Sequence, residues 1–432
     1  MDISVLVLVI TFVVLLLVNV PIAIAIAAAT LVTMLLTVDA LPAVTTIAQR
    51  MSAGMDSFAL LAIPFFILSG YLMGQGGIAK RLIEFARVIV GRLPGGLAFV
   101  NVIACALFGS ISGSAVAATS AIGGFMIPAM EKEGYDREFS TAVTVTASTT
   151  GLLIPPSNIL IIFSLASGGV SIAALFIAGY LPGLLVAGSL MIVCGIYAKK
   201  RGYPVGEKIP LSEALSKMLG AIPSLFLIFL VIGGIIGGYF TPTEAGAIAV
   251  LYSLLLSMCL YREIKPRDLP DILQKSVTTT SIVMLLIGAS AAMSWLLSYE
   301  NIPQMISASI LGLTNEKILI LLLVNLILLA VGTFMDMTPA VLIFTPILMP
   351  IMDSLGISPL HFGIIMILNL SIGLCTPPVG SVLFVGCSIG KTRITSVIKP
   401  LMPLYFAMFG ALALVTAFPS ISEALPRALG LY

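Results

Sequence analysis

Long apolar runs follow one another along almost the whole chain, and they restrict its fold more than any other feature. The runs cover residues 3–37, 57–79, 97–130, 138–166, 172–198, 219–240, 243–261, 276–298, 318–352, 358–390 and 400–418. A bilayer-spanning helix needs about 20 such residues, and membrane β-barrels instead use short alternating segments. Only 9% of the residues are charged, against about 25% in soluble domains. We therefore expect an all-α polytopic membrane protein and exclude a soluble enzyme, a nucleic-acid-binding protein and a disulfide scaffold.

Two of the runs do not fit a simple alternation of crossings. The connections richest in Lys and Arg, at 80–92, 199–217, 262–275 and 391–399, are predicted to be cytoplasmic. Runs 97–130 and 318–352 must then return to the side from which they enter, as re-entrant helical hairpins that open to opposite faces. The other runs make nine full crossings, of which 3–37 is the first, with the N-terminus inside and the C-terminus outside.

The two predicted hairpins begin two copies of one pattern. The landmarks are Gly109, Gly134, Gly151 and Pro155-Pro156 in the first copy, and Gly332, Gly356, Gly373 and Pro377-Pro378 in the second. Their spacing agrees apart from a single one-residue slip. An odd number of crossings separates the copies, so they are predicted to be inverted relative to each other. Inverted repeats with interrupted helices are typical of secondary transporters.

Polar residues interrupt each copy twice, at 109–114 and 148–158 and at 332–339 and 371–380. Paired prolines end a helix, and the freed carbonyls must face protein or a hydrated cavity because lipid cannot satisfy them. Carbonyls with Ser and Thr hydroxyls suit a small cation such as Na⁺, while half-helix N-termini favour an anion. Asn158 follows one proline pair and either orients a substrate carboxylate or hydroxyl or caps a helix.

Asp336 is the carboxylate inside a break, and an intramembrane acid is a functional candidate by default. It can neutralise a cation, relay a proton or cap a half-helix. Three function classes remain open on the residues alone: a sodium-coupled transporter, a proton-coupled one, and a passive channel for organic anions. The chain has no GxSxG, HExxH or phosphate-binding loop, so we expect that it is not an enzyme.

Several stretches resemble the large membrane subunit of tripartite ATP-independent periplasmic (TRAP) transporters. They are Pro-Phe-Phe-Ile-Leu-Ser-Gly at 64–70, Gly-Ser-Ile-Ser-Gly-Ser-Ala-Val at 109–116, Gly-Leu-Leu-Ile-Pro-Pro-Ser at 151–157, Phe-Thr-Pro-Thr-Glu-Ala at 240–245 and Thr-Pro-Pro-Val-Gly at 376–380. The resemblance covers essentially the whole chain. It implies an elevator-type fold in which a scaffold holds a mobile transport domain, made of the two hairpins and the two broken helices.

The resemblance also implies partners and a cargo. A small four-helix membrane subunit joins this one in the bacterial inner membrane, and a periplasmic binding protein delivers an organic-acid anion for sodium-coupled import. The serine-rich stretch at 110–114 and the sequence Ala-Thr-Ser-Ala-Ile-Gly at 118–123 resemble the sialic-acid branch more than the C4-dicarboxylate branch. Scaffold segments are expected at 1–96, 181–317 and 396–432, and the two transport repeats at 97–180 and 318–395.

Site residues follow from the same resemblance, position by position. One sodium site is expected near Ser110, Ser112, Gly113, Gly151 and Pro156. The other is expected near Gly332, Thr333, Asp336, Gly373, Cys375 and Thr376. The substrate is expected between them, near Ser114, Ser157, Asn158, Thr338 and Gly380.

Overall fold

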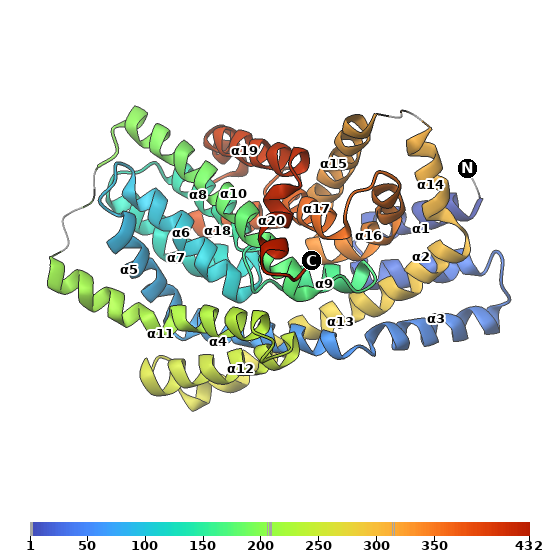
Figure 1. Ribbon diagram of the computed structural model, residues 1–432, viewed down its shortest axis with the longest axis horizontal. Helices are drawn as coiled ribbons and strands as arrows, with labels where there is room; N and C mark the ends of the chain where they lie inside the picture. The colour runs from blue at the N-terminus through green and yellow to red at the C-terminus, as the bar shows by residue number, and fades with distance from the viewer. Residues whose placement is uncertain (1–2, 205, 207–209, 313, 315) are drawn as a thin grey trace.

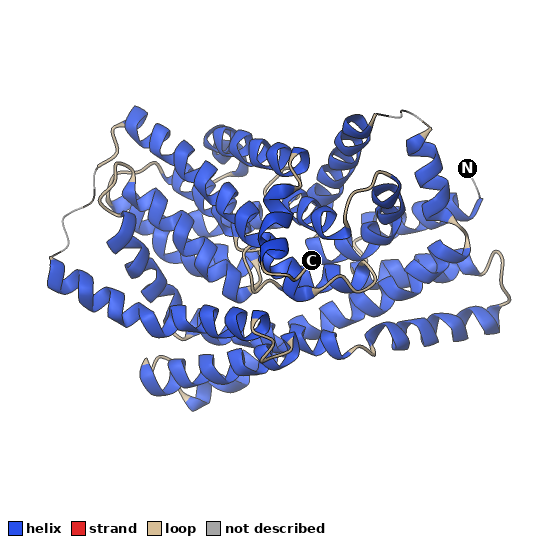
Figure 2. Ribbon diagram, viewed as in Figure 1, coloured by secondary structure: helices blue, strands red, loops and turns tan. Residues whose placement is uncertain are grey.

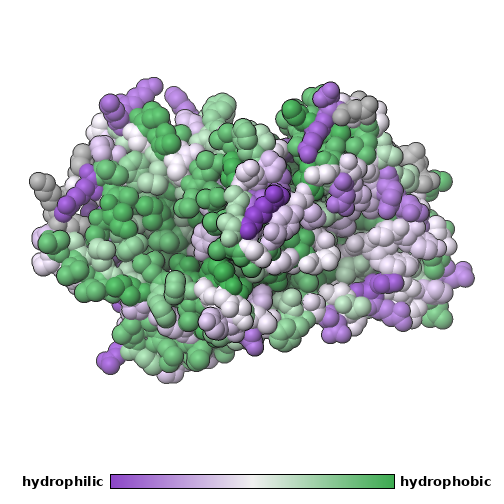
Figure 3. Space-filling view, in the orientation of Figure 1, coloured by the Kyte–Doolittle hydropathy of each residue, from purple (hydrophilic) through white to green (hydrophobic). Residues whose placement is uncertain are grey.

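The computed structural model describes residues 3–204, 206, 210–312, 314 and 316–432. Within these residues all regular structure is helical (Figure 2), which confirms the predicted all-α class. Eight of the described helices are long and apolar enough to cross a membrane. Apolar residues cover much of the face drawn in Figure 3, and hydrophilic residues gather there in smaller groups. Such a surface suits a hydrocarbon environment.

The helices follow one another along the chain as labelled in Figure 1. The first half contains α1 (Ile3–Leu17), α2 (Ile22–Met34), α3 (Ala40–Met55), η1 (Phe58–Leu61), α4 (Ala62–Gln75), α5 (Ile78–Val90), α6 (Gly96–Ser112), α7 (Ala115–Lys132), α8 (Arg137–Thr150), α9 (Asn158–Ala166) and α10 (Ile172–Arg201). The second half contains α11 (Leu211–Ile236), α12 (Pro242–Leu255), η2 (Leu256–Leu260), η3 (Pro266–Asp268), α13 (Leu269–Tyr299), α14 (Ile302–Leu311), α15 (Lys317–Phe334), α16 (Met337–Ser354), α17 (Pro359–Gly373), α18 (Ser381–Gly390), α19 (Ile394–Ala417) and α20 (Ser420–Ala428).

Both predicted hairpins and both predicted broken helices are present. The first hairpin is α6–α7, which turns at Gly113 in the left-handed region (φ +62°), and the second is α15–α16, which turns at 335–336. The first break (151–157) separates α8 from α9, and the second break (374–380) separates α17 from α18. Each break contains one of the proline pairs, and both Pro–Pro peptide bonds are cis.

The prediction that the run 3–37 forms a single first span is wrong. The chain folds into two short helices there, and α1 packs against α2. Asn19 adopts a left-handed conformation (φ +64°) directly after α1, and Pro21 precedes α2. A left-handed residue ends a helix, and proline cannot donate the hydrogen bond that would continue one. The apolar composition of the run concealed these two local signals.

The packing of the helices extends the repeat well beyond the hairpins. Within each copy, the first hairpin helix lies on the first half of the broken helix, as α6 on α8 and α15 on α17. Other contacts join one copy to the other. The second half of each broken helix packs on the second hairpin helix of the other copy, so α18 packs on α7 and α9 packs on α16. In the same way α12 packs on α4, and α2 packs on α13. Of these last four helices, α4, α12 and α13 lie along the lower edge of Figure 1, as do α3 and α11. Each half therefore depends on the other for part of its core.

Glycines explain how the hairpin helices approach the broken helices so closely. A Cβ on Gly151 would lie 2.4 Å from the Cα of Gly109, and a Cβ on Gly373 would lie 2.5 Å from the carbonyl carbon of Gly332. Two backbones are thus in direct contact in each copy, which residues other than glycine would prevent. These are the glycines that marked the repeat in the sequence.

Buried asparagines hold the same helix pairs together. In the first copy Asn101 on α6 donates to the hydroxyl of Thr144 on α8, at 2.7 Å. In the second copy Asn369 on α17 donates to the side chain of Asn325 on α15, also at 2.7 Å. A buried amide needs such a partner, so the two bonds set the register of each pair.

The five-segment division into scaffold and transport repeats stays a prediction. Segments 1–96 and 181–317 include residues outside the described ranges.

Candidate functional site

The ends of eight half-helices meet around one region of the molecule. Helices α6, α8, α15 and α17 end at the hairpin tips and breaks, whereas α7, α9, α16 and α18 begin there. A cavity of about 590 Å³ lies at this place, between the two tips, the two breaks and the helices α4 and α13. Helix N-termini present free N–H groups and partial positive charge, and C-termini present free carbonyls. The region therefore offers donors for an anion and acceptors for a cation.

The tip of the first hairpin and the start of α9 form one wall of the cavity. The Ser114 hydroxyl caps α7 by accepting the N–H of Ala117 at 3.2 Å. Gly113 lies so close to Asn158 that a Cβ there would be 2.8 Å from the amide nitrogen of that side chain. The buried Oδ1 of Asn158 has no hydrogen-bond partner among the described residues. An unsatisfied amide in a cavity wall is available to a ligand.

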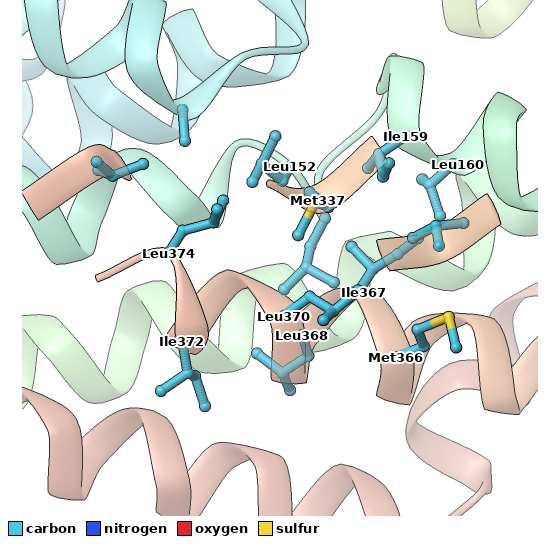
Figure 4. Close-up of a cluster of buried hydrophobic side chains, with 14 of the residues drawn as sticks. Leu152, Ile159, Leu160, Met337, Met366, Ile367, Leu368, Leu370, Ile372 and Leu374 are labelled. Atoms are coloured by element: carbon cyan, nitrogen blue, oxygen red, sulfur yellow. The ribbon is translucent and has the colours of Figure 1, made fainter. Parts of the chain in front are cut away.

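The tip of the second hairpin forms the opposing wall. Asp336 precedes the first residue of α16 and is accessible from the cavity, with Met337 and Thr338 beside it. Figure 4 shows Met337 in a group of apolar side chains with Leu152 of the first break and Ile159 of α9. Leu374 of the second break also lines the cavity. Apolar contacts between the copies thus surround a small number of polar groups, as is usual for a small-molecule site.

The hydroxyl groups of the expected sodium sites lie just behind the tips. Ser110 donates to the carbonyl of Leu107, and Thr376 donates to that of Ile372, both at 2.8 Å. Thr333 donates to its own helix in the same way, at 2.8 Å. A hydroxyl that donates its hydrogen to a backbone carbonyl three or four residues earlier still has oxygen lone pairs free to bind a cation. No cluster of three or more His, Cys, Asp and Glu residues occurs in the part of the chain that the structure describes.

The structure places the predicted site residues in two groups. The residues that line the cavity are Ser112, Gly113, Ser114, Asn158, Asp336 and Thr338. The others are Ser110, Gly151, Pro156, Ser157, Gly332, Thr333, Gly373, Cys375, Thr376 and Gly380, which belong to the hairpin ends and breaks behind that lining.

Three more of the residues behind the lining also have partners. Ser157 is buried and donates to the carbonyl of Leu152 at 2.6 Å. The N–H of Gly380 donates to the carbonyl of Thr333 at 3.3 Å, which ties the second break to the second hairpin. The carbonyl of Cys375 accepts the hydroxyl of Tyr405. These residues can support the site, but they do not reach a ligand in the cavity as it stands.

Sequence reasoning missed the polar groups that α4 and α13 contribute to the cavity. Tyr71 and Gln75 on α4 and Thr279 on α13 line the cavity, and the Tyr71 hydroxyl lies 2.9 Å from that of Thr279. Their signal was present, since each is a polar residue inside an apolar run. Runs 57–79 and 276–298 are distant in sequence, however, and nothing in either one indicated that they meet.

Comparisons with known proteins identify relatives over nearly the whole chain. The family described as "Tripartite ATP-independent periplasmic transporter, DctM component" matches residues 9–421. Protein YgiK of Salmonella typhimurium is 56% identical over 92% of this chain and 91% of its own. The C4-dicarboxylate TRAP transporter large permease protein DctM of Rhodobacter capsulatus is 39% identical over 93% and 94%. The sialic acid TRAP transporter large permease protein SiaM of Vibrio cholerae is 38% identical over 88% and 89%.

A solved structure shares the fold at much lower sequence similarity. The YdaH transporter of Alcanivorax borkumensis, which is described as having an unusual topology, superposes with a TM-score of 0.66 at 16% identity, over 90% of this chain and 91% of that one. This likeness concerns the fold alone. The extent of the family match and the identities of the relatives agree with the residues that suggested the resemblance. The chain therefore belongs to the DctM component, the large permease, of the tripartite ATP-independent periplasmic transporters.

Proposed function

We propose that this chain imports an organic-acid anion together with Na⁺ across the bacterial inner membrane, with a small four-helix membrane subunit and a periplasmic binding protein as partners. The observation that carries the proposal is the meeting of the N-termini of α7, α9 and α16 with the C-terminal ends of α6, α8 and α17 around one cavity. N-termini suit the carboxylate of a substrate and carbonyl-rich C-termini suit Na⁺. Both ligands can then be held with one formal charge, that of Asp336.

Sialic acid is the first substrate candidate, and C4-dicarboxylates are second. Relatives are named for C4-dicarboxylate, sialic acid, isethionate and 2,3-diketo-L-gulonate. Their sequence identities to this chain are all close to 39%, so identity does not favour one of these substrates. The cavity supports placing sialic acid before C4-dicarboxylates, because its described lining contains Ser, Thr, Tyr, Asn and Gln side chains but neither Lys nor Arg. A polyhydroxylated monocarboxylate needs many neutral hydrogen-bonding groups and one anion site. A dicarboxylate needs two.

An elevator movement is the mechanism we propose. The cavity lies between the hairpin tips and the scaffold helices α4 and α13, so sliding of the hairpins past these helices would carry a bound substrate with them. Gly70 of α4 lies close to the first tip, because a Cβ there would be 3.1 Å from the Cα of Ser112. A contact of backbone on backbone presents no side chain that would resist sliding.

Transport by the complete complex tests the proposal. The purified complex is reconstituted into proteoliposomes, and uptake of labelled sialic acid or succinate is measured with an inward Na⁺ gradient and the binding protein present. We expect uptake that accumulates sialic acid and stops when choline replaces Na⁺. Uptake that continues unchanged in choline would contradict sodium coupling.

Two other functions predict different outcomes in the same assay. Asp336 in the cavity wall favours proton coupling as the second candidate, and that function requires a pH gradient to replace the Na⁺ gradient. A passive channel would show equilibration without accumulation.

A further inference from the structure

A second and larger cavity lies outside the candidate transport site. It has a volume of about 820 Å³ and opens between α15, α17, α19 and α20. Its walls are mainly apolar, with Leu321 and Leu329 from α15 and Leu412 from α19. Folded interiors are packed too tightly to leave such a space. The cavity is therefore a place for something that the chain itself does not provide.

In the first copy of the internal repeat, the corresponding helices pack more closely than they do around this space. In the first copy α6 packs on α10, and the ring of Phe99 lies against Gly195, where a Cβ would be 3.2 Å from it. Leu322 stands ten residues before Gly332, just as Phe99 stands ten residues before Gly109. The smaller Leu322 lines the cavity, and over their described lengths α15 and α19 do not pack closely on each other. A cavity beside Phe99 and Gly195 in the first copy has a volume of only about 420 Å³, so the gap in the second copy is about twice as large.

The gap borders on a lipid-facing surface. Ile318, Leu322 and Leu326 are 78%, 55% and 56% exposed and continue the cavity wall onto the outer face of α15. Exposed apolar residues on a spanning helix face hydrocarbon. A membrane lipid can therefore enter the cavity from the side with no polar barrier for its acyl chain.

One end of the cavity is polar, and α20 builds it. The hydroxyl of Ser422 lies 2.6 Å from Nδ1 of His361, and Ser358 donates to Glu423, so α20 is fixed on the start of α17. This attachment puts Arg427 at the mouth of the cavity. The C-terminal helix thus adds a charged edge to an apolar groove.

The charges at this mouth favour an anion. Arg427 pairs with Glu423 at 2.6 Å, and its side chain remains 64% exposed. Lys317 donates to the carbonyl of Leu355 at 3.0 Å and forms no ion pair with any carboxylate among the described residues. The mouth therefore carries one uncompensated positive charge. A phosphate there would gain charge-assisted hydrogen bonds from both cations.

A polar group inside the groove matches the middle of a phospholipid. The Oγ1 of Thr416 is buried, lines the cavity and has no partner among the described residues. It is the next-to-last residue of α19, between the apolar wall and the charged mouth. An ester carbonyl of a glycerolipid is an acceptor that would satisfy such a hydroxyl.

We propose that the cavity between α15, α17, α19 and α20 binds one anionic phospholipid. An acyl chain lies along Leu321, Leu329 and Leu412, and the phosphate lies against Lys317 and Arg427. The proposal concerns a site separate from the transport cavity, and it holds whatever the chain transports.

Native mass spectrometry of the full chain in mild detergent tests this site. The chain is titrated with dioleoylphosphatidylglycerol, dioleoylphosphatidylcholine or oleate. We expect one tight phosphatidylglycerol equivalent with at least about fivefold preference over phosphatidylcholine, which is about the 1 kcal/mol expected of one surface charge. Lys317→Gln and Arg427→Gln should each remove most of that preference. Ala413→Trp, which fills the groove from α19, should remove the tight equivalent itself.

Two control variants keep the result specific. Lys80→Gln removes an exposed cation on α5, and Met402→Trp adds a ring to α19 away from the cavity. Both should bind phosphatidylglycerol as the native chain does. The proposal is overturned if phosphatidylglycerol and phosphatidylcholine bind equally to the native chain, or if Lys317→Gln and Ala413→Trp leave the tight equivalent unchanged. Tighter binding of oleate than of phosphatidylglycerol would also overturn it, since the occupant would then be a fatty acid.

Discussion

Under the proposed function, replacement of Gly151 by alanine should weaken sodium binding. Its Cβ would lie 2.4 Å from the Cα of Gly109, which is 1.0 Å less than the 3.4 Å at which ordinary contact begins. The obstructing atoms are backbone, so no side chain can rotate away. The end of α6 must move by about 1 Å relative to the first break, and with it the hydroxyl of Ser110.

The expected size of the effect follows from packing energetics. Overpacking by one methyl group costs about 1–3 kcal/mol. Every 1.4 kcal/mol changes an affinity tenfold, so strain that falls on the cation-bound arrangement should lower sodium affinity by about 5- to 140-fold. Gly373→Ala should have a similar effect through the second copy, because its Cβ would lie 2.5 Å from the carbonyl carbon of Gly332.

The assay is the Na⁺ dependence of substrate uptake in proteoliposomes that contain the complete complex. Gly124→Ala is the matched control, since it lies in the same hairpin and its Cβ would meet nothing within 4 Å. The control should keep the native half-saturation and, as a helical Gly→Ala change, should not lower the melting temperature. A native Na⁺ dependence in both Gly151→Ala and Gly373→Ala would refute the idea that these crossings shape the cation sites.

Three further predictions use the same assay. Ser112→Ala and Thr376→Ala should each raise the Na⁺ concentration for half-maximal uptake, and an unchanged value in both would argue against hydroxyl ligands at either site. Asp336→Asn should lower sodium affinity at least tenfold if the carboxylate neutralises the cation, whereas loss of pH-driven uptake with intact Na⁺ dependence would indicate proton coupling instead. Gly70→Ala should slow uptake several-fold while substrate binding persists, because it puts a methyl group 3.1 Å from the hairpin tip; Gly74→Ala, whose Cβ meets only a ring atom at 3.6 Å, should transport normally.

The sequence was most informative where backbone geometry depends on residue type. Gly151 and Gly373 marked the helix crossings, and the proline pairs marked the two breaks, because other residues cannot replace glycine at a backbone contact or continue a helix through two prolines. The hairpins and broken helices were therefore predictable to within a few residues. The division of 3–37 was missed because hydropathy was given more weight than Asn19 and Pro21.

Other features depend on distances between helices that no local pattern encodes. The meeting of Tyr71 with Thr279 requires α4 to pack on α13, although the two residues are 208 positions apart in the sequence. The cavity beside α15 likewise reflects the separation of two helices. In the sequence Leu322 is one more apolar residue in a spanning helix. Its position in the wall of a cavity becomes apparent only when the structure around it is compared with that around Phe99 in the other copy.

The charges of the transport cavity explain why the proposed transporter would need its cation. The described lining contains the carboxylate of Asp336 and neither Lys nor Arg, so an anion that enters is attracted only by helix N-termini. Each N-terminus contributes roughly half an elementary charge, and part of that attraction is offset by Asp336. A Na⁺ ion behind the hairpin tips adds a full positive charge next to the same cavity. Under the proposed function the anion therefore binds after the cation, and coupling arises at binding rather than during movement. This order also gives Asp336→Asn a second consequence: without the carboxylate, the cavity should hold the anion more readily in the absence of Na⁺ than the native cavity does.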